Sequence, residues 1–336
     1  MKRFVKVVVF ALFTVLCLIT ISATVTNSWP ILLGPNARPL TNRTFDLTPV
    51  RLERGKYLTE NVLGCFDCHS QRNWDLPGAP PIAEMKGAGF VIEEEGFGKT
   101  ALPNITPDVE TGAGSWTDDM LARAIREGIG HDGRALFPFM PYQNYSALSD
   151  EDLASVIVYL RSIPAVRNEL PKSEVPFPIN FLIRGAPRPI TSPVAEPDVS
   201  DSIKRGAYLV QIAACTKCHT PSTKGTPIAG MEFSGGHTFK GPFGEVASAN
   251  LTPDASGIPY YDEALFFQTI RTGHVGARKL SSVMPWTFYR NMTDQDLKSI
   301  FAYLRTLKPV SHRVDNSEQP TLCKKCGAMH GGGEGN

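Results

Sequence analysis

The sequence lacks an excess of charge of either sign. Its 336 residues carry 34 Lys and Arg against 33 Asp and Glu, a formal net charge of +1. A protein that binds nucleic acid normally gathers a basic excess on one face, so this balance gives no support for a nucleic-acid partner. Proline (27) and glycine (29) are plentiful instead, which predicts short helices joined by irregular loops and argues against a large sheet.

Long apolar runs are also scarce, and the one that stands out lies at the N-terminus. Residues 7–25 are apolar apart from Ser and Thr, and they follow a basic start. This is the pattern of a secretory signal, for which Ser22 and Ala23 offer a cleavage site. At about 1.5 Å per residue, however, the run also nearly crosses a hydrocarbon core of about 30 Å. We expect residues 1–28 to be a membrane anchor in preference to a cleaved signal, and in both cases the body of the chain is exported.

The chain repeats itself after this segment. The stretch CFDCH at residues 65–69 returns as CTKCH at residues 215–219. RGKYL and NITPD around the first copy return as RGAYL and NLTPD around the second, and the 27 residues that begin at Met140 match those that begin at Met284 without a gap. The unit is about 110 residues long, which is the size of a domain and not of a solenoid repeat.

The repeat predicts two tandem domains, over residues 51–166 and 201–310. Apolar residues in the C-terminal part of each unit recur with the spacing of an amphipathic helix, and Ser149 is a suitable N-cap for the first of these helices. The predicted fold class is therefore all-α. Residues 167–200 hold seven prolines and are expected to form an extended linker, and residues 311–336, with a glycine-rich end, a flexible tail.

The repeated Cys-x-x-Cys-His motif is compatible with three kinds of site: a disulfide, half of a zinc site, or a haem attachment point. A disulfide is the simple alternative in an exported chain, and zinc would need a second Cys pair that neither unit offers. Two copies in matching units favour haem, to which both thiols bind as thioethers while the His ligates the iron. We predict two haem c groups, attached covalently at Cys65, Cys68, Cys215 and Cys218, with His69 and His219 as axial ligands.

The sixth ligand of each iron decides between an electron carrier and a catalyst. Met140 and Met284 occupy the same position in the two units, each before a Pro and the C-terminal helix. A single Met is usually a flexible filler of the core, but equivalent placement in both copies favours Met140 and Met284 as axial ligands. Met292 has Leu148 as its counterpart and is interpreted as core. Three histidines have no counterpart in the other unit and are interpreted as loop or surface residues: His131, His237 and His274.

These motifs resemble those of bacterial membrane-associated c-type cytochromes, a group that includes the cytochrome subunits of periplasmic alcohol, aldehyde and gluconate dehydrogenases. The resemblance rests on RGKYL…CFDCH, NITPD, the stretch that begins at Met140, and their second copies, and it covers about residues 51–310. It implies two tandem all-helical cytochrome c domains with covalent haem and His/Met ligation. Those subunits usually carry three haems, whereas this chain has two motifs.

The resemblance also implies a place in the cell and a set of partners. The chain would lie at the bacterial inner membrane facing the periplasm, or be soluble in the periplasm if the signal is cleaved. It would transfer electrons from a dehydrogenase or a quinol-oxidising complex to an oxidase or a soluble cytochrome. Two other functions stay open: a dihaem peroxidase with one open iron, and a non-catalytic cytochrome subunit held in a dehydrogenase complex.

A third cysteine pair lies in the tail, in the stretch TLCKKCGAMH. Cys323 and Cys326 imitate the haem motif, but Gly327 stands where the His is required, so no third haem is expected. A disulfide is the favoured interpretation. A metal site using Cys323, Cys326 and His330 is the alternative, and the sequence identifies no fourth ligand for it.

Overall fold

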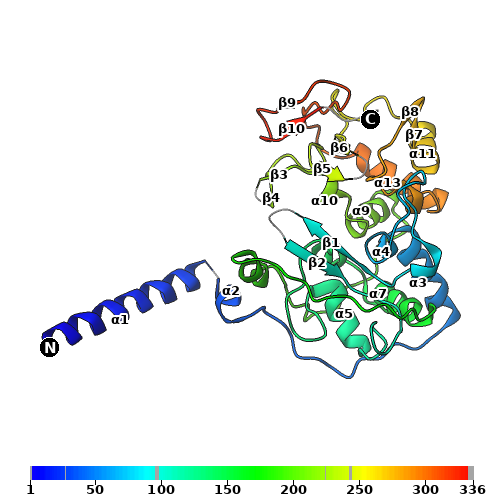
Figure 1. The fold of residues 1–336 in the computed structure, drawn as a ribbon. Coiled ribbons are helices and arrows are strands. Elements are labelled where there is room, and N and C mark those ends of the chain that lie inside the picture. Colours follow the sequence, from blue (N-terminus) through cyan, green and yellow to red (C-terminus); the bar gives the residue numbers. More distant parts are fainter. Residues whose placement is uncertain (1, 27, 95–97, 224, 242–243, 332–336) are drawn as a thin grey trace.

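The computed structural model describes residues 2–26, 28–94, 98–223, 225–241 and 244–331. These residues form two helical lobes, which follow each other in the sequence, and one helix that projects from the side of the molecule (Figure 1).

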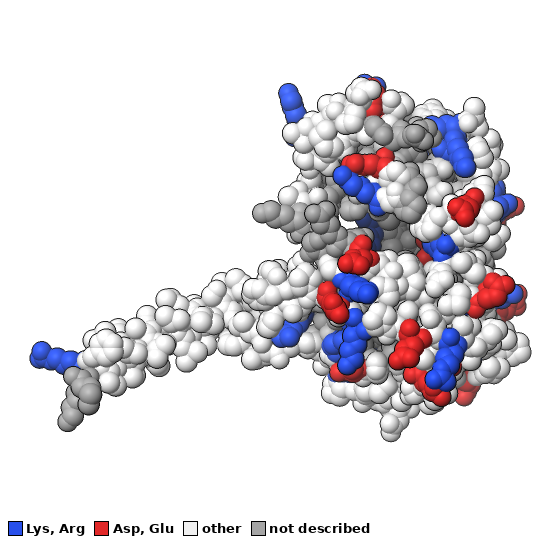
Figure 2. Space-filling view, viewed as in Figure 1, with Lys and Arg blue, Asp and Glu red and all other residues white. Residues whose placement is uncertain are grey.

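The projecting helix, α1 (Lys2–Val25), contains the apolar run. Its segment Arg3–Val25 has a mean hydropathy of 2.7, and its most apolar window is 0% buried against the rest of the chain. Among the described residues it is the one helix long and apolar enough to cross a membrane, a test that signal sequences also pass. Figure 2 shows it as an arm with few charges, whereas charges of both signs are mixed over the two lobes.

Arg38 makes the main charged contact between the first lobe and the chain that follows this helix. After a short helix, α2 (Trp29–Leu33), residues 34–48 run in extended form along the lobe. The Arg38 guanidinium donates to both carboxylate oxygens of Asp119, at 2.8 and 2.7 Å, and to a carboxylate oxygen of Glu127 at 2.8 Å. Both carboxylates are buried, so this contact ties the segment firmly to the lobe.

The first lobe is built on two long helices, α3 (Pro49–Asn61) and α7 (Asp150–Ser162), which pack against each other. Ser149 caps α7, as predicted, by accepting a hydrogen bond from the Asp152 amide. Gly55 in the RGKYL motif permits the close approach, because a Cβ there would lie 1.9 Å from the Ser155 carbonyl oxygen. The lobe is completed by α4 (Cys65–Cys68), η1 (Ala83–Met85), β1 (Phe90–Glu94), β2 (Gly98–Leu102), α5 (Asp118–Glu127) and α6 (Tyr142–Tyr145).

The second lobe has the same plan, with α9 (Ser202–Ile212) packed on α13 (Asp294–Arg305). Gly206 in the RGAYL motif plays the part of Gly55, since a Cβ there would lie 1.9 Å from the Ser299 carbonyl oxygen. The lobe is completed by α10 (Cys215–His219), β3 (Ser222–Thr223), β4 (Thr226–Pro227), β5 (Thr238–Gly241), β6 (Gly244–Ala247), α11 (Glu263–Thr272), β7 (His274–Val275), β8 (Arg278–Lys279) and α12 (Trp286–Tyr289).

The fold is mainly helical, but it is not strictly all-α as the periodicity predicted. The described residues also form five two-stranded antiparallel sheets, of which β1–β2 is the longest, with five paired residues per strand. Four of these sheets lie in the loops between helices and the fifth, β9–β10, follows the last helix, α13. Helical periodicity cannot reveal such short hairpins.

The two lobes are joined by a reciprocal pair of hydrogen bonds. The Tyr57 hydroxyl of the first lobe donates to the Asp296 carboxylate of the second, and the Tyr208 hydroxyl of the second lobe donates to the Asp152 carboxylate of the first at 2.7 Å. Each carboxylate also forms an ion pair with the arginine of its own lobe's RG motif: Arg54–Asp152 at 2.8 Å and Arg205–Asp296 at 2.6 Å. One apolar core runs through both lobes, so they pack as one body.

The linker and the tail are more ordered than their composition predicted. Residues 167–200 contain a short helix, α8 (Ile179–Leu182), and a 3-10 turn, η2 (Ile183–Gly185), both of which contact α2. The tail, predicted to be flexible, forms a hairpin of β9 (Thr321–Leu322) and β10 (Met329–His330). The glycine-rich end, 332–336, lies outside the described residues.

Candidate functional site

The two lobes enclose a single cavity of about 3150 Å³. Ligand pockets commonly measure about 300–1,000 Å³, so this cavity has room for more than one large cofactor. Figure 2 shows the molecule hollowed between the lobes. All eight residues that the sequence nominated line the cavity: Cys65, Cys68, His69, Met140, Cys215, Cys218, His219 and Met284.

The two cysteine motifs enter the cavity on short helical turns. In the first lobe Gly64 has a φ of +64°, which ends the run from α3 and starts α4 in a new direction, and the His69 amide donates to the Cys65 carbonyl at 2.9 Å. In the second lobe Ala214 takes the equivalent left-handed conformation, with a φ of +56°. This conformation costs a residue with a Cβ about 1–2 kcal/mol, and the turn nevertheless keeps the same shape.

Both motif histidines are oriented for metal ligation. His69 Nδ1 lies 2.8 Å from the Pro103 carbonyl oxygen, and His219 Nδ1 lies 2.8 Å from that of Ala249. A carbonyl oxygen can only accept, so Nδ1 carries the proton and Nε2 keeps a free lone pair, which is the usual arrangement in metal-bound histidines. Burial lowers the pKa of both imidazoles and therefore favours the neutral form that ligates a metal.

The NITPD and NLTPD motifs explain this orientation. Pro103 immediately precedes Asn104, whose side chain accepts from the Thr106 amide at 3.0 Å and donates to the Val166 carbonyl at 2.7 Å. Ala249 precedes Asn250, which makes the same two contacts in the second lobe, at 2.9 Å each. The asparagines thus fix the carbonyls that orient the histidines. The repeat revealed the motif, but only the structure shows what it does.

The cysteines of both motifs are free and open into the cavity. Burial and the neighbouring Cys68 raise the pKa of the Cys65 thiol to about 12, and burial raises the pKa of the Cys215 thiol to about 12 as well. In the part of the chain that the structure describes, neither motif gathers three metal-ligating atoms, as half of a zinc site would require. Free thiols beside a neutral His with a free Nε2, in a large cavity, fit covalent haem.

Met140 and Met284 sit on loops of nearly identical shape. The Met140 amide donates to the Phe137 carbonyl at 3.2 Å, and the Met284 amide to the Ser281 carbonyl at 3.0 Å. The prolines that follow have backbone angles of φ −82°, ψ 47° and φ −82°, ψ 48°. Met292, by contrast, is 2% exposed and belongs to the core, as its Leu148 counterpart indicated. The repeat therefore extends to the shape of the two loops that carry the candidate sixth ligands.

Two of the unmatched histidines, interpreted from sequence as loop or surface residues, also reach this cavity. His131 and His237 line it, and His131 stacks on Trp116 with ring centroids 4.4 Å apart. Two arginines at equivalent positions of α5 and α11, in the stretches IREG and IRTG, do not line it. Arg126 pairs with Asp150 at 2.5 Å, and Arg271 makes the equivalent ion pair with the first residue of α13.

A comparison with protein families matches residues 203–308 to the cytochrome c family model. Residues 203–308 are a cytochrome c domain. The domain includes the CTKCH turn of α10 and the Met284 loop. A cytochrome c domain binds haem covalently and carries electrons, so the predicted haem c cofactor is confirmed for this domain, whereas the residues that bind it stay predictions.

Curated relatives carry related names. The chain is 32% identical over 276 residues to a nicotinate dehydrogenase subunit of Pseudomonas putida, covering 76% of this chain and 21% of that protein. It is 28% identical over 312 residues to the fructose dehydrogenase cytochrome subunit of Gluconobacter japonicus, covering 85% and 59%. It is 27% identical over 259 residues to a diheme cytochrome c-type protein of Cereibacter sphaeroides, covering 74% and 83%.

These alignments extend well beyond the cytochrome c domain of residues 203–308. The chain spans less than two thirds of the length of the nicotinate and fructose dehydrogenase relatives. Further relatives are also named as cytochrome c subunits of quinone alcohol or gluconate dehydrogenases, which agrees with the resemblance seen in the motifs.

Proposed function

We propose that the chain is a dihaem c-type cytochrome that transfers electrons and is not itself a catalyst. The observation that carries the proposal is the presence of two matched Cys-x-x-Cys-His turns, α4 and α10, that open into one cavity. The relative named as a diheme cytochrome, of which the chain covers 83%, supports the count of two.

Each haem would be held by residues of one lobe. Cys65 and Cys68 would form the thioethers of the first and His69 would ligate its iron, while Cys215, Cys218 and His219 would do the same for the second. The bound haem supplies one-electron redox chemistry. The chain would supply the axial ligands and the hydrogen bonds that fix them, and both influence the potential.

Met140 and Met284 are the proposed sixth ligands. If both Met residues ligate their irons, little ligand rearrangement would accompany electron transfer, and peroxide would find no open position. A thioether ligand raises the potential relative to a second His. This suits a carrier that receives electrons from a dehydrogenase or a quinol and passes them to an oxidase or a soluble cytochrome of higher potential.

The contacts between the lobes support electron transfer from one haem to the other. Lys217, inside the second motif, donates to the Phe139 carbonyl of the first Met loop at 2.7 Å. Asn144, in α6 of the first lobe, donates to the Thr216 hydroxyl of the second motif at 3.2 Å. Each site therefore shares a wall with the other, and the shared contacts hold the two cofactor positions at a fixed separation.

Axial substitution tests the assignment. We expect Met140→His to lower the potential of the first haem and to leave the second nearly unchanged, with Met284→His doing the reverse. A redox titration followed by visible spectroscopy resolves the reduction of the two haems as separate waves. Met292→Leu is the matched control, because it exchanges a core Met for Leu, the residue at the equivalent position 148 of the first lobe. Unchanged potentials in one Met→His variant would disprove the Met assignment in that lobe, and peroxidase turnover would then become the leading function.

The haem count and the cellular setting have simple tests. The denatured mass of the native protein should include two haems; one or three would overturn the proposal. We propose that α1 anchors the chain in the inner membrane with the lobes in the periplasm, and that a dehydrogenase is the electron donor, as the names of the relatives suggest. Purification from membranes should bring the donor along, while an N-terminus near Thr24 would instead indicate a cleaved signal and a soluble form.

A further inference from the structure

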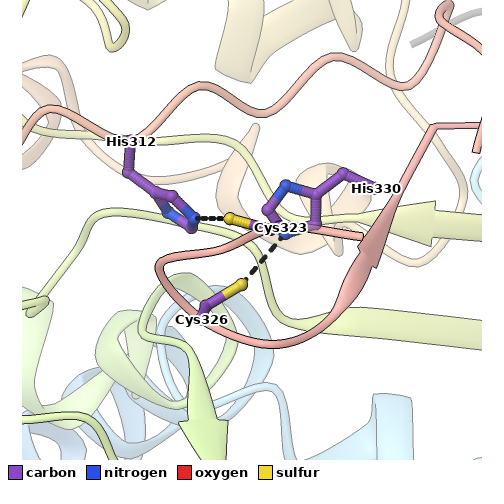
Figure 3. A group of neighbouring side chains, drawn as sticks. All are labelled: His312, Cys323, Cys326 and His330. Carbon is purple, nitrogen blue, oxygen red and sulfur yellow. Dashed lines mark hydrogen bonds between the residues drawn. The ribbon is translucent and has the colours of Figure 1, made fainter. Parts of the chain in front are cut away.

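Four metal-ligating side chains converge behind the second lobe, outside the large cavity. They are His312, Cys323, Cys326 and His330, and their ligand atoms all lie within 4.8 Å of one another. His312 Nε2 lies 3.3 Å from Cys323 Sγ, and His330 Nε2 lies 3.3 Å from Cys326 Sγ (Figure 3). Figure 3 shows the two rings and the two sulfurs turned toward a common centre.

We propose that these four residues bind one Zn²⁺ ion in a structural Cys₂His₂ site. In a tetrahedral zinc site, Zn–S bonds of about 2.3 Å and Zn–N bonds of about 2.0 Å place neighbouring ligand atoms about 3.3–3.8 Å apart. The two His–Cys contacts of 3.3 Å lie in this range, and all four ligand atoms lie within 4.8 Å of one another. Two sulfurs and two imidazoles are a donor set that selects zinc over harder cations. Four protein ligands leave no open position, so the site is structural.

The first lobe provides an internal comparison for His312. Asn168 occupies the equivalent position, two residues after the end of the gapless repeat. Asn168 Nδ2 donates to the Ala88 carbonyl at 2.9 Å, and His312 Nδ1 makes the same contact with the Ser234 carbonyl at 3.0 Å. His312 therefore keeps the structural hydrogen bond of the asparagine and adds a second nitrogen, Nε2, that points at the cysteines. A ligating His normally has its other nitrogen fixed in this way.

A glycine makes room for the two rings. Gly236 follows Gly235, whose amide donates to the His219 carbonyl at 2.8 Å. In the first lobe the corresponding glycine is Gly89, and Phe90 follows it. A Cβ at Gly236 would lie 2.5 Å from Cε1 of His312 and 3.0 Å from Nε2 of His330. The glycine thus opens the space that the imidazoles of the second lobe occupy.

The backbone around the cysteines has the form of a tight metal-binding turn. The Cys323 amide donates to the Ala328 carbonyl and the Gly327 amide to the Cys323 carbonyl, both at 2.9 Å, and Gly327 has a φ of +74°. This turn connects β9 to β10 and carries His330 back toward the cysteines. The glycine that replaces the haem motif's His therefore suits the left-handed backbone of the turn.

The disulfide favoured from the sequence is not formed in the structure, where Cys323 and Cys326 are both free. A disulfide would also use both sulfurs and leave two buried imidazoles, His312 at 1% and His330 at 7% exposed, without their partners. Binding of Zn²⁺ releases the two thiol protons, and the resulting centre of two thiolates, two neutral imidazoles and one dication has no net charge. A neutral centre suits a buried position.

The position of the site indicates its role. Ser234 bonds to His312, and the next residue, Gly235, bonds to the backbone of His219. The chain between the helical lobe and the zinc site, residues 311–317, lines the large cavity except for His312 itself, which is turned to the other side. The ion would pin this segment against the second motif, whereas the equivalent position in the first lobe carries only Asn168.

Metal analysis of the full-length protein tests the proposal. After exhaustive dialysis against zinc-free buffer, mass spectrometry of the metals should find one zinc per chain. His312→Asn installs the residue of the first lobe, keeps the hydrogen bond to Ser234 and should reduce bound zinc by at least about tenfold. His274→Asn removes a histidine outside the cluster and should retain the zinc. Equal zinc in wild type and His312→Asn would overturn the assignment.

A measurement on the wild type keeps the test independent of how the variants fold. With zinc bound, Cys323 and Cys326 should resist alkylation, and a chelator should make both reactive; peptide mapping separates them from Cys17 and the haem motifs. A C-terminal peptide two hydrogens lighter than the dithiol would show a disulfide and refute the site. Thiols that alkylate equally with and without added Zn²⁺ would refute it as well.

Discussion

The two tyrosines that join the lobes allow a test of whether the lobes fold as one unit. Tyr208→Phe removes a hydroxyl that donates to the buried Asp152 carboxylate at 2.7 Å and accepts from the Ser149 amide at 3.2 Å. Tyr57→Phe does the same at Asp296 and the Thr293 amide, the latter at 3.1 Å. Burial and the hydrogen bond to Asp296 raise the pKa of Tyr57 to about 12, so at neutral pH this hydroxyl is a donor.

The expected cost follows from what each substitution leaves behind. A hydrogen bond to a charged group contributes about 1.5–3 kcal/mol, and a buried donor left without a partner costs about 1–3 kcal/mol. In the Tyr208→Phe variant the Asp152 carboxylate keeps both bonds from Arg54, at 2.8 Å each, so no unpaired charge is created. We therefore expect each single substitution to lower the unfolding free energy by about 2–3 kcal/mol.

Calorimetry of the full-length protein checks this expectation. The wild type should unfold in one transition, and the Tyr57→Phe/Tyr208→Phe double variant in two, because the reciprocal bonds between the lobes are gone. Tyr159→Phe is the matched control: it removes a tyrosine–carboxylate bond, to Glu60, that stays inside the first lobe. This control should lower stability without splitting the transition. A single transition in the double variant, with a loss below about 1 kcal/mol, would show that the apolar core alone couples the lobes.

Two further predictions concern each lobe separately. On helix propensity alone, Gly206→Ala would stabilise the fold by about 1 kcal/mol. Its Cβ would lie 1.9 Å from the Ser299 carbonyl oxygen, however, so denaturant titration should show a net loss of unfolding free energy of about 1–3 kcal/mol. A gain in unfolding free energy would mean that α9 and α13 can move apart without cost. In the first lobe, burial opposes and Arg38 favours ionisation of Asp119, and the balance lowers the pKa of Asp119 from 3.8 to about 2. This ion pair should therefore stabilise fully above about pH 4 and lose about 2 kcal/mol as the pH falls toward 2, a slope that Asp119→Asn should abolish.

The repeat made much of the site predictable from sequence. Comparing one half of the chain with the other separated Met140 and Met284, which are partly buried on matched loops, from Met292, which is fully buried in the core. The same comparison marked Gly55 and Gly206 as matched residues, although not as the points where two helices come closest. A repeat identifies which residues are equivalent, and it does not say what they contact.

Contacts between the lobes were not predictable in the same way. Tyr57 and Tyr208 are visible as matched residues, yet their partners lie 239 and 56 positions away in the sequence. Sequence periodicity describes one helix face at a time, whereas the orientation of two packed lobes depends on long-range packing. The shared cavity, which depends on that orientation, could be found only in three dimensions.

The proposed zinc ligands could not be predicted from the repeat, because they lie where the two copies differ. His312 stands where the first lobe has Asn168, and Gly236 where it has Phe90. Neither difference indicates a metal site alone, and the glycine-rich end of the tail predicted flexibility. Together with the turn at Gly327 they bring four ligands to one centre. In a duplicated fold, shared residues therefore indicate the common cofactor site, and paired departures from the repeat indicate what one copy does alone.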